Sequence, residues 1–176
     1  MSDTDAPNRW DSALWAAIVP WLEEAYPAEG CGLILEDSRG RWNFRRCENV
    51  IDRYHKLDPE QYPRTSKDFY MIDPREFIAA DERGEAVAVI VHSHPDAGDY
   101  FSDSDVEAAL MPRQTPQEPV EPIYPGADYL VVSVRQGEAV AASLFRFDEE
   151  SGKFERTRRF DADVLTRRAV DAPTTG

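Results

Sequence analysis

The strongest constraint on the fold is an apolar run, Ala86–Val91, that leads directly into the motif His92-Ser93-His94-Pro95. Such a run, bounded by a proline, predicts a buried strand. Side chains alternate between the two faces of a strand, so His92 and His94 point to one side and Ser93 to the other. Pro95 has no N–H and ends the strand ladder, which makes it a structural residue. The sequence therefore predicts two imidazoles side by side at the end of a strand.

A third candidate ligand follows shortly after this strand. Ser102 is a natural N-cap for a short helix, and it places Asp105 in the first turn of that helix. Two neutral imidazole nitrogens and one carboxylate oxygen suit Zn²⁺, and three protein ligands leave a fourth position open for water, as a catalytic site requires. The hypothesis is one zinc ion held by His92, His94 and Asp105. A His-x-His pair alone is more often a pair of ordinary polar residues.

The complete string H-S-H-P-x(6)-S-x-x-D, from His92 to Asp105, resembles the signature of the JAMM/MPN+ zinc metalloproteases, also called Mov34/MPN/PAD-1 or JAB domains. That family includes deubiquitinating isopeptidases and small prokaryotic relatives. The resemblance covers roughly residues 14–160. It implies a single MPN-like domain with a mixed, curved β-sheet flanked by helices, a cytidine-deaminase-like architecture. Many members have proline before the motif serine, where this chain has Phe101, and we expect this difference to leave the ligands unchanged.

The resemblance also implies a catalytic base. The family carries its catalytic glutamate ahead of C-G-L-L-type residues, and Ala28-Glu29-Gly30-Cys31-Gly32-Leu33 matches this pattern. In that role Glu29 would take a proton from water and pass it to the leaving amine. Spacing alone does not connect Glu29 to the histidines. The competing interpretation treats Glu29 as one of 34 acidic residues on a solvated surface.

Ser102 has two candidate roles. As a plain N-cap its hydroxyl would bond a backbone N–H, which is worth about 1 kcal/mol of stability. The matching family serine instead donates to the developing oxyanion, and losing such a donor costs on the order of a hundredfold in rate. We favour the second role for Ser102. The role of Ser93, which points away from the metal, stays open.

Periodicity and turn signals predict the remaining elements. The expected elements are a helix from Trp10 to Ala25 with a kink or break near Val19 at Pro20, a hairpin of residues 28–36 and 42–47, a short strand over 69–72, a helix between Asp73 and Gly84, a helix over 103–111, and strands over 129–134, 140–147 and 153–160. Early alternation of helices and strands followed by a run of strands indicates an α+β domain. Residues 49–67 and the proline-rich segment 112–125 are expected to be irregular loops.

We expect one domain over residues 10–160, with a flexible leader over 1–9 and a C-terminal tail over 161–176 that is disordered at its end. The net charge of −14 argues against binding nucleic acid or an anionic membrane. An acidic N-terminus and the absence of a long apolar run indicate a cytoplasmic protein. The two cysteines, Cys31 and Cys47, are expected to be buried free thiols.

Three functions are consistent with the sequence. The leading hypothesis is a zinc-dependent isopeptidase or peptidase that cuts after the C-terminal tail of a ubiquitin-like or sulfur-carrier β-grasp protein, with the activating or conjugating enzymes of that pathway as further partners. The second keeps the site but acts on other peptides, on cell-wall fragments in a phage-tail setting, or on a cysteine-linked carrier precursor. The third is a non-catalytic MPN scaffold, which the complete ligand set disfavours.

Overall fold

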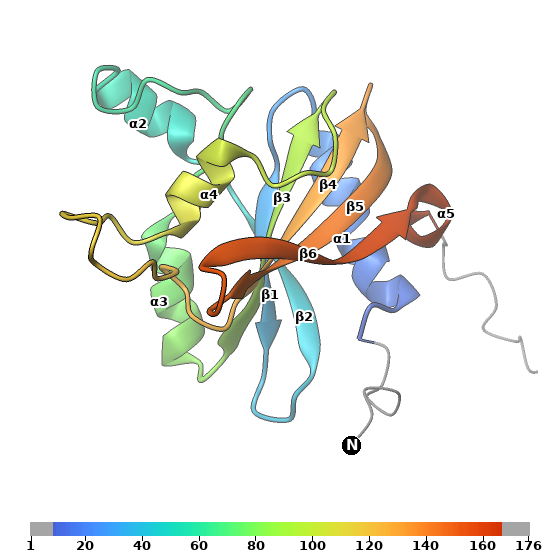
Figure 1. Cartoon of the computed structure of the whole chain (residues 1–176). Helices are drawn as coiled ribbons and strands as arrows, with labels where there is room; N and C mark the ends of the chain where they lie inside the picture. Colours follow the sequence, from blue (N-terminus) through green and yellow to red (C-terminus); the bar gives the residue numbers. More distant parts are fainter. Residues whose placement is uncertain (1–8, 167–176) are drawn as a thin grey trace, which may run out of the picture.

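The computed structural model describes residues 9–166 of the chain (Figure 1). In chain order they form α1 (Ser12–Ala25), β1 (Cys31–Glu36), β2 (Trp42–Cys47), α2 (Ile51–Leu57), α3 (Pro74–Glu82), β3 (Ala86–Pro95), α4 (Asp103–Ala109), β4 (Asp128–Arg135), β5 (Glu138–Asp148), β6 (Lys153–Asp161) and α5 (Ala162–Leu165). The strands make one sheet in the order β2-β1-β3-β4-β5-β6. In this sheet β3 and β4 are parallel and the other neighbours are antiparallel. This mixed sheet confirms the predicted α+β class.

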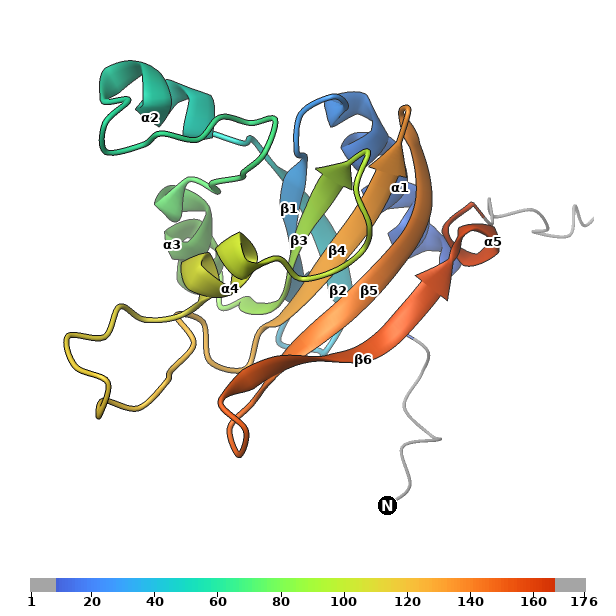
Figure 2. The ribbon, with the colours of Figure 1, turned by 45° about the horizontal axis from the view of Figure 1, so that its top comes forward.

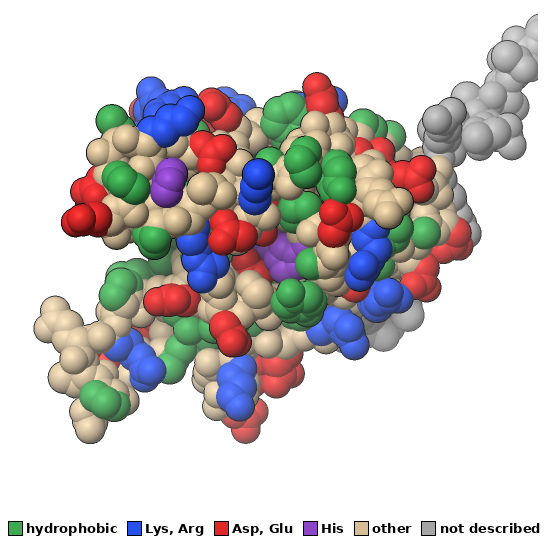
Figure 3. Space-filling model, turned by 90° about the horizontal axis from the view of Figure 1, so that it is seen from above, with side chains coloured by type: hydrophobic (Ala, Val, Ile, Leu, Met, Phe, Trp, Pro, Cys, Tyr) green, Lys and Arg blue, Asp and Glu red, His purple; other side chains and the backbone are tan. Residues whose placement is uncertain are grey.

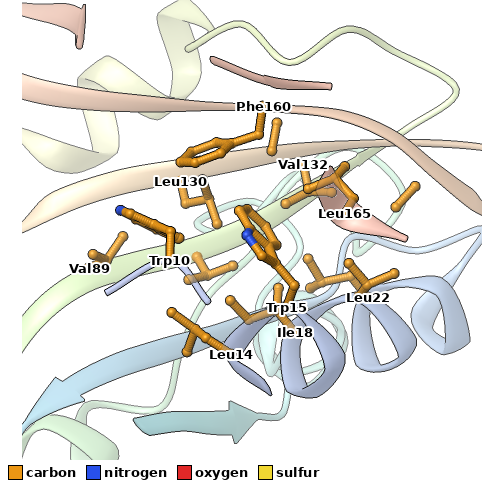
Figure 4. Close-up of a cluster of buried hydrophobic side chains, with 14 of the residues drawn as sticks. Trp10, Leu14, Trp15, Ile18, Leu22, Val89, Leu130, Val132, Phe160 and Leu165 are labelled. Atoms are coloured by element: carbon orange, nitrogen blue, oxygen red, sulfur yellow. The ribbon is translucent and has the colours of Figure 1, made fainter. Parts of the chain in front are cut away.

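Two apolar cores lie on opposite faces of the sheet, one under α1 and the other under α3 and α4 (Figures 1 and 2). Residues of the first core include Trp10, Leu14, Trp15, Ile18, Leu22, Val89, Leu130, Val132, Phe160 and Leu165 (Figure 4). Alternation along β3 assigns Val89 and Val91 to this core and Ile90 to the other. The same alternation sends His92 and His94 to the face covered by α3 and α4.

Helix α1 runs unbroken from Ser12 to Ala25 through Pro20, so the break predicted near Val19 is absent. A proline inside a helix removes one backbone hydrogen bond. Ile18 and Leu22, on either side of it, are completely buried against the sheet. Their burial holds the helix together across the missing bond.

The segment between β2 and α3 differs from the prediction. Residues 49–67 contain α2, which has no side-chain N-cap and a single buried residue, Ile51. With so little apolar periodicity, this helix gives no visible signal in the sequence. The strand predicted over 69–72 is wrong, because its backbone forms only an isolated bridge at Ile72. The apolar side chains there pack over α3 and the sheet instead of extending a ladder.

Helix α4 ends at Ala109, two residues earlier than predicted, because Leu110 is extended and bridges Pro122. The loop predicted over residues 112–125 is confirmed, since it contains no helix or strand. In Figure 2 this loop extends from the end of α4 away from the sheet. The prolines account for this irregular path, because they remove the donors that a helix or strand needs.

The folded part continues past the predicted domain end at residue 160. Residue 161 belongs to β6, residues 162–165 form α5, and Leu165 is buried in the α1-side core. At the other end Arg9 already pairs with Glu36. The remainder of the predicted leader and tail, residues 1–8 and 167–176, lies outside the described residues.

Cys31 and Cys47 face each other across β1 and β2 as buried free thiols, as predicted. Burial raises the pKa of both thiols, which keeps them protonated and unreactive. Within residues 9–166, none of the helices is both long enough and apolar enough to span a bilayer.

Candidate metal centre

The three predicted metal ligands converge at the end of β3. The Nε2 atoms of His92 and His94 lie 3.1 Å apart. Each is 3.2 Å from a different carboxylate oxygen of Asp105, which comes from the first turn of α4. All three side chains are buried, and one ligand atom from each lies within 4.8 Å of the others. Two imidazole nitrogens and a carboxylate oxygen are therefore gathered around one point.

The tautomer of His94 suits metal binding. Its Nδ1 lies 2.9 Å from the backbone carbonyl oxygen of Gly98. A carbonyl oxygen only accepts hydrogen bonds, so Nδ1 carries the proton and Nε2 presents its lone pair to the cluster. Gly98 was not identified from the sequence, because a backbone carbonyl leaves no sequence signal. The residues present thus fit a single divalent metal ion.

The pKa shifts favour the ligand forms of Asp105 and His92 but the protonated form of His94. Burial alone would raise the pKa of Asp105, but the two imidazoles and the Ser102 hydroxyl hold it well below its ordinary range. Burial lowers the pKa of His92, which keeps this ring neutral. Burial also lowers the pKa of His94, but the negative charges of Asp105 and Glu29 have the larger effect, so the pKa of His94 is raised. The raised pKa favours a second proton on the ring, at Nε2, and a bound metal ion would displace that second proton.

Ser102 forms a complete capping box at the start of α4. Its hydroxyl accepts from the Asp105 N–H at 3.2 Å and donates to the Asp105 carboxylate at 2.7 Å. The Ser102 N–H donates to the same carboxylate at 2.8 Å. The structure thus shows the capping role and places the hydroxyl directly beside a ligand. The oxyanion role of Ser102 stays a prediction.

Glu29 lies beside the cluster. The antiparallel register pairs Cys31 with His92, and Ser93 bonds Gly30, so Glu29 comes level with His94 on the same face of the sheet. Its side chain is buried, at 6% exposure, and its Oε2 has no hydrogen-bond partner. Burial raises its pKa to about 8, and Asp105 adds to the rise while His94 opposes it. A buried carboxylate with an unused oxygen is the arrangement that a general base requires.

Ser93 has the local role that the sequence left open. Its hydroxyl accepts from the Gly30 N–H at 2.8 Å, and its own N–H donates to the Gly30 carbonyl at 2.9 Å. This double contact continues the pairing of β1 with β3 one residue beyond Cys31 and His92. It ties the entry of β1, immediately after Glu29, to the centre of the histidine motif.

Aromatic rings surround the cluster. Tyr70 stacks on His92 with centroids 4.3 Å apart and planes 17° apart, and Tyr100 meets His94 edge-on at 5.2 Å. Neither contact was predicted, because neither tyrosine belongs to a motif. Seen from above, histidine atoms appear at the bottom of a hollow in the surface (Figure 3). The hollow thus leaves histidine atoms open to the surface on this side.

Comparison with known proteins agrees with this geometry. Residues 11–146 match the family described as prokaryotic homologs of the JAB domain. The chain belongs to this family. The matched range contains Glu29 and the three candidate metal ligands, His92, His94 and Asp105. The resemblance inferred from the motif is thereby confirmed, and the family includes metalloproteases.

Individual relatives share parts of this JAB domain. Tail tip assembly protein K of Escherichia phage N15 is 32% identical over 99 residues, which are 54% of this chain and 35% of that protein. The chain thus spans about a third of that relative's length. A protein of known structure from Salinibacter ruber matches with a TM-score of 0.53, 25% identity and coverage of 84% of this chain and 87% of its own. Another protein of known structure, from Desulfitobacterium hafniense, matches with a TM-score of 0.53, 19% identity and coverage of 82% of this chain and 85% of its own. At this identity the match supports the fold alone.

Proposed function

We propose that this JAB domain is a zinc-dependent peptidase of the isopeptidase type. The observation that carries the proposal is the convergence of His92, His94 and Asp105 with a buried glutamate that keeps one carboxylate oxygen unpaired. An inactive scaffold has no need of a complete ligand set or of a buried, unpaired carboxylate, which is costly for folding. The donor set of two imidazoles and one carboxylate is typical of catalytic zinc.

Each residue has a distinct task in this proposal. His92, His94 and Asp105 would hold the zinc ion, which when bound supplies Lewis acidity and a readily deprotonated water. Glu29 accepts a proton from water and returns it to the leaving nitrogen. The single hydroxyl proton of Ser102, which goes to Asp105 in the metal-free protein, turns to the carbonyl oxygen of the scissile bond as negative charge develops there. Burial of Glu29 raises its proton affinity, which suits both the uptake and the return of the proton.

We propose as substrate the C-terminal tail of a ubiquitin-like or sulfur-carrier β-grasp protein, cut at the amide bond that follows the tail. A thin, extended tail fits a centre that lies at the bottom of a hollow (Figure 3). The net charge of −14 favours a partner with a basic or neutral surface. Activating or conjugating enzymes of the same pathway are then further partners.

The phage relative supports a second candidate. The name of that protein associates it with tail tip assembly. A JAB peptidase with the same centre would in that setting cut other peptides or cell-wall fragments. The two candidates share the chemistry and differ only in the substrate.

One experiment separates these functions. The zinc-loaded protein is incubated with a panel of β-grasp proteins fused through their C-termini to a reporter, with unrelated peptides and with cell-wall fragments, and Glu29→Gln serves as the matched control. We expect cleavage at the β-grasp tail by the parent alone. Cleavage of only the other substrates would support the second candidate. A protein that purifies without zinc and cuts nothing would indicate a scaffold.

A further inference from the structure

The side chain of Asn49 joins three segments that surround the metal centre. Its Nδ2 donates to the backbone carbonyls of Glu29 and Phe69, both at 3.0 Å. Its Oδ1 accepts from the N–H groups of Met71 at 3.0 Å and Ile51 at 3.3 Å. An amide side chain has two donors and two main acceptor positions, and here all four are used. Asn49 thus fixes the backbone on either side of Tyr70 and the backbone of Glu29 at the same time.

The position of the Glu29 carboxylate depends on its backbone. Oε2 has no hydrogen-bond partner, so no side-chain contact at that oxygen fixes the group. The backbone, in contrast, is held on both sides: the Glu29 N–H donates to the Ser66 carbonyl, and the Glu29 carbonyl accepts from Asn49. The bond from Asn49 is the one in this pair that a single side-chain substitution removes.

The two histidine ligands are oriented in different ways. The ring of His94 is fixed by its hydrogen bond to the Gly98 carbonyl. The Nδ1 of His92 is buried and has no partner. Metal-binding histidines are usually oriented by a hydrogen bond at the second nitrogen. For His92 the near-parallel stack with Tyr70 takes the place of that bond.

Packing does not enclose Tyr70 on every side. Tyr70 is only partly buried, and it lines an open cavity of about 190 Å³ together with Phe77, Tyr124 and other residues. The backbone of its two chain neighbours is bonded to Asn49. These two bonds keep the short segment, and with it the ring, in place.

We propose that Asn49 is the positioning residue of the centre: one amide side chain sets the catalytic base Glu29 and, through Tyr70, the metal ligand His92. The inference rests on the proposed function. It predicts that loss of Asn49 weakens metal binding although Asn49 is not a ligand. Substituting partners of metal ligands typically lowers metal affinity ten- to a hundredfold.

The test measures zinc affinity by competition with a chelating dye, and the absorption spectrum of the Co²⁺-loaded protein, for the parent, Asn49→Ala and Asn49→Asp. We expect both variants to bind zinc at least tenfold more weakly and to shift the Co²⁺ bands. Asp11→Ala is the control, because it removes the N-cap of α1 far from the centre and lowers stability without touching these contacts. It is expected to keep the affinity and spectrum of the parent.

Two Tyr70 variants test the link to His92 independently of how well the Asn49 variants fold. Tyr70→Phe keeps the stacked ring and is expected to bind zinc like the parent, whereas Tyr70→Leu is expected to match the loss seen for Asn49. The inference would be overturned if Asn49→Ala and Tyr70→Leu both bound zinc as tightly as the parent. If the Asn49 variants do not fold, a parental zinc affinity in Tyr70→Leu alone would overturn it. A parent that binds no zinc would instead refute the proposed function.

The effect of Asn49 on Glu29 is measured separately, by enzyme kinetics. At saturating zinc, with a substrate that the parent cleaves, Asn49→Ala is expected to lose kcat at least tenfold with little change in KM, because the base is displaced and substrate binding is not. A variant that recovers the full parental kcat once saturated with zinc would show that Asn49 does not position Glu29.

Discussion

Glu29 carries a folding cost that depends on pH. In the metal-free protein burial raises its pKa to about 8 from an ordinary value near 4.5. The folded state therefore binds more protons than the unfolded state between these two values, and stability falls as the pH rises from about 4.5 to about 8. Gln has the same shape without the charge, so metal-free Glu29→Gln should unfold at a higher temperature than the parent at pH 8.

The measurement is thermal unfolding of metal-free Glu29→Gln and parent at pH 5 and at pH 8. The difference between them is expected to shrink at pH 5, where Glu29 is protonated in the folded state. With zinc bound, the same variant should lose about a hundred- to ten-thousandfold in kcat. Equal pH dependence of the two metal-free proteins would show that Glu29 is not buried as the structure has it.

Ser102 offers a way to separate the cap from the chemistry. Glycine is nearly as good an N-cap as serine, whereas alanine costs about 1 kcal/mol. We expect Ser102→Ala to lose that stability in urea unfolding and Ser102→Gly to lose only a few tenths of a kcal/mol. Both lack the hydroxyl, so both should lose on the order of a hundredfold in kcat at saturating zinc. A Ser102→Gly variant with parental kcat would show that Ser102 acts only as the N-cap of α4.

At the scale of elements, β3 and α4 were predictable because local rules determine them. Alternation along a strand places His92 and His94 on one face, and a serine cap places Asp105 in a first turn. Helix α2 and the segment over 69–72 were not predictable in this way. Their conformation depends on side-chain bonds to distant backbone, above all those of Asn49, and such bonds have no period in the sequence.

The junction of β1 and β3 depends on one hydroxyl. The regular pairing of these strands ends at Cys31 and His92, and beyond it the Ser93 side chain takes the Gly30 N–H. Ser93→Ala would leave that buried N–H without a partner, at a cost of about 1–3 kcal/mol. Urea unfolding of the metal-free protein measures this loss. Ser143→Ala, which removes another buried hydroxyl from the sheet, is the matched comparison because its bond goes to the partly exposed side chain of Asp99. Equal losses in the two variants would argue against a special role for the junction.

On the scale of the whole molecule, the centre lies where the sheet meets a helix. Two ligands come from β3, in the middle of the sheet, and the third comes from α4, which lies over one of its faces (Figure 2). The sequence indicated these ligands because they are close together along the chain. It linked Glu29 to them only through the family resemblance, because the contact depends on the pairing of β1 with β3, and the paired residues Cys31 and His92 are 61 positions apart in the chain. The position of Asn49 depends on the same long-range assembly.

A metal ion that bridges β3 and α4 should stabilise the entire domain. Binding to the folded state alone contributes RT ln(1 + [L]/Kd), which is about 4 kcal/mol when free zinc is a thousand times the Kd. We therefore expect zinc to raise the Tm of the parent and of Glu29→Gln alike, since Glu29 is not a ligand.

Asp105→Asn should show little zinc-induced rise in Tm, because it loses the ligand that comes from α4. His92, His94 and Asp105 bind a metal only in their deprotonated forms, so the zinc-induced rise in Tm should also become smaller as the pH falls. A rise in Tm of the same size in Asp105→Asn would mean that zinc binds elsewhere, and the centre at the end of β3 would have to be abandoned.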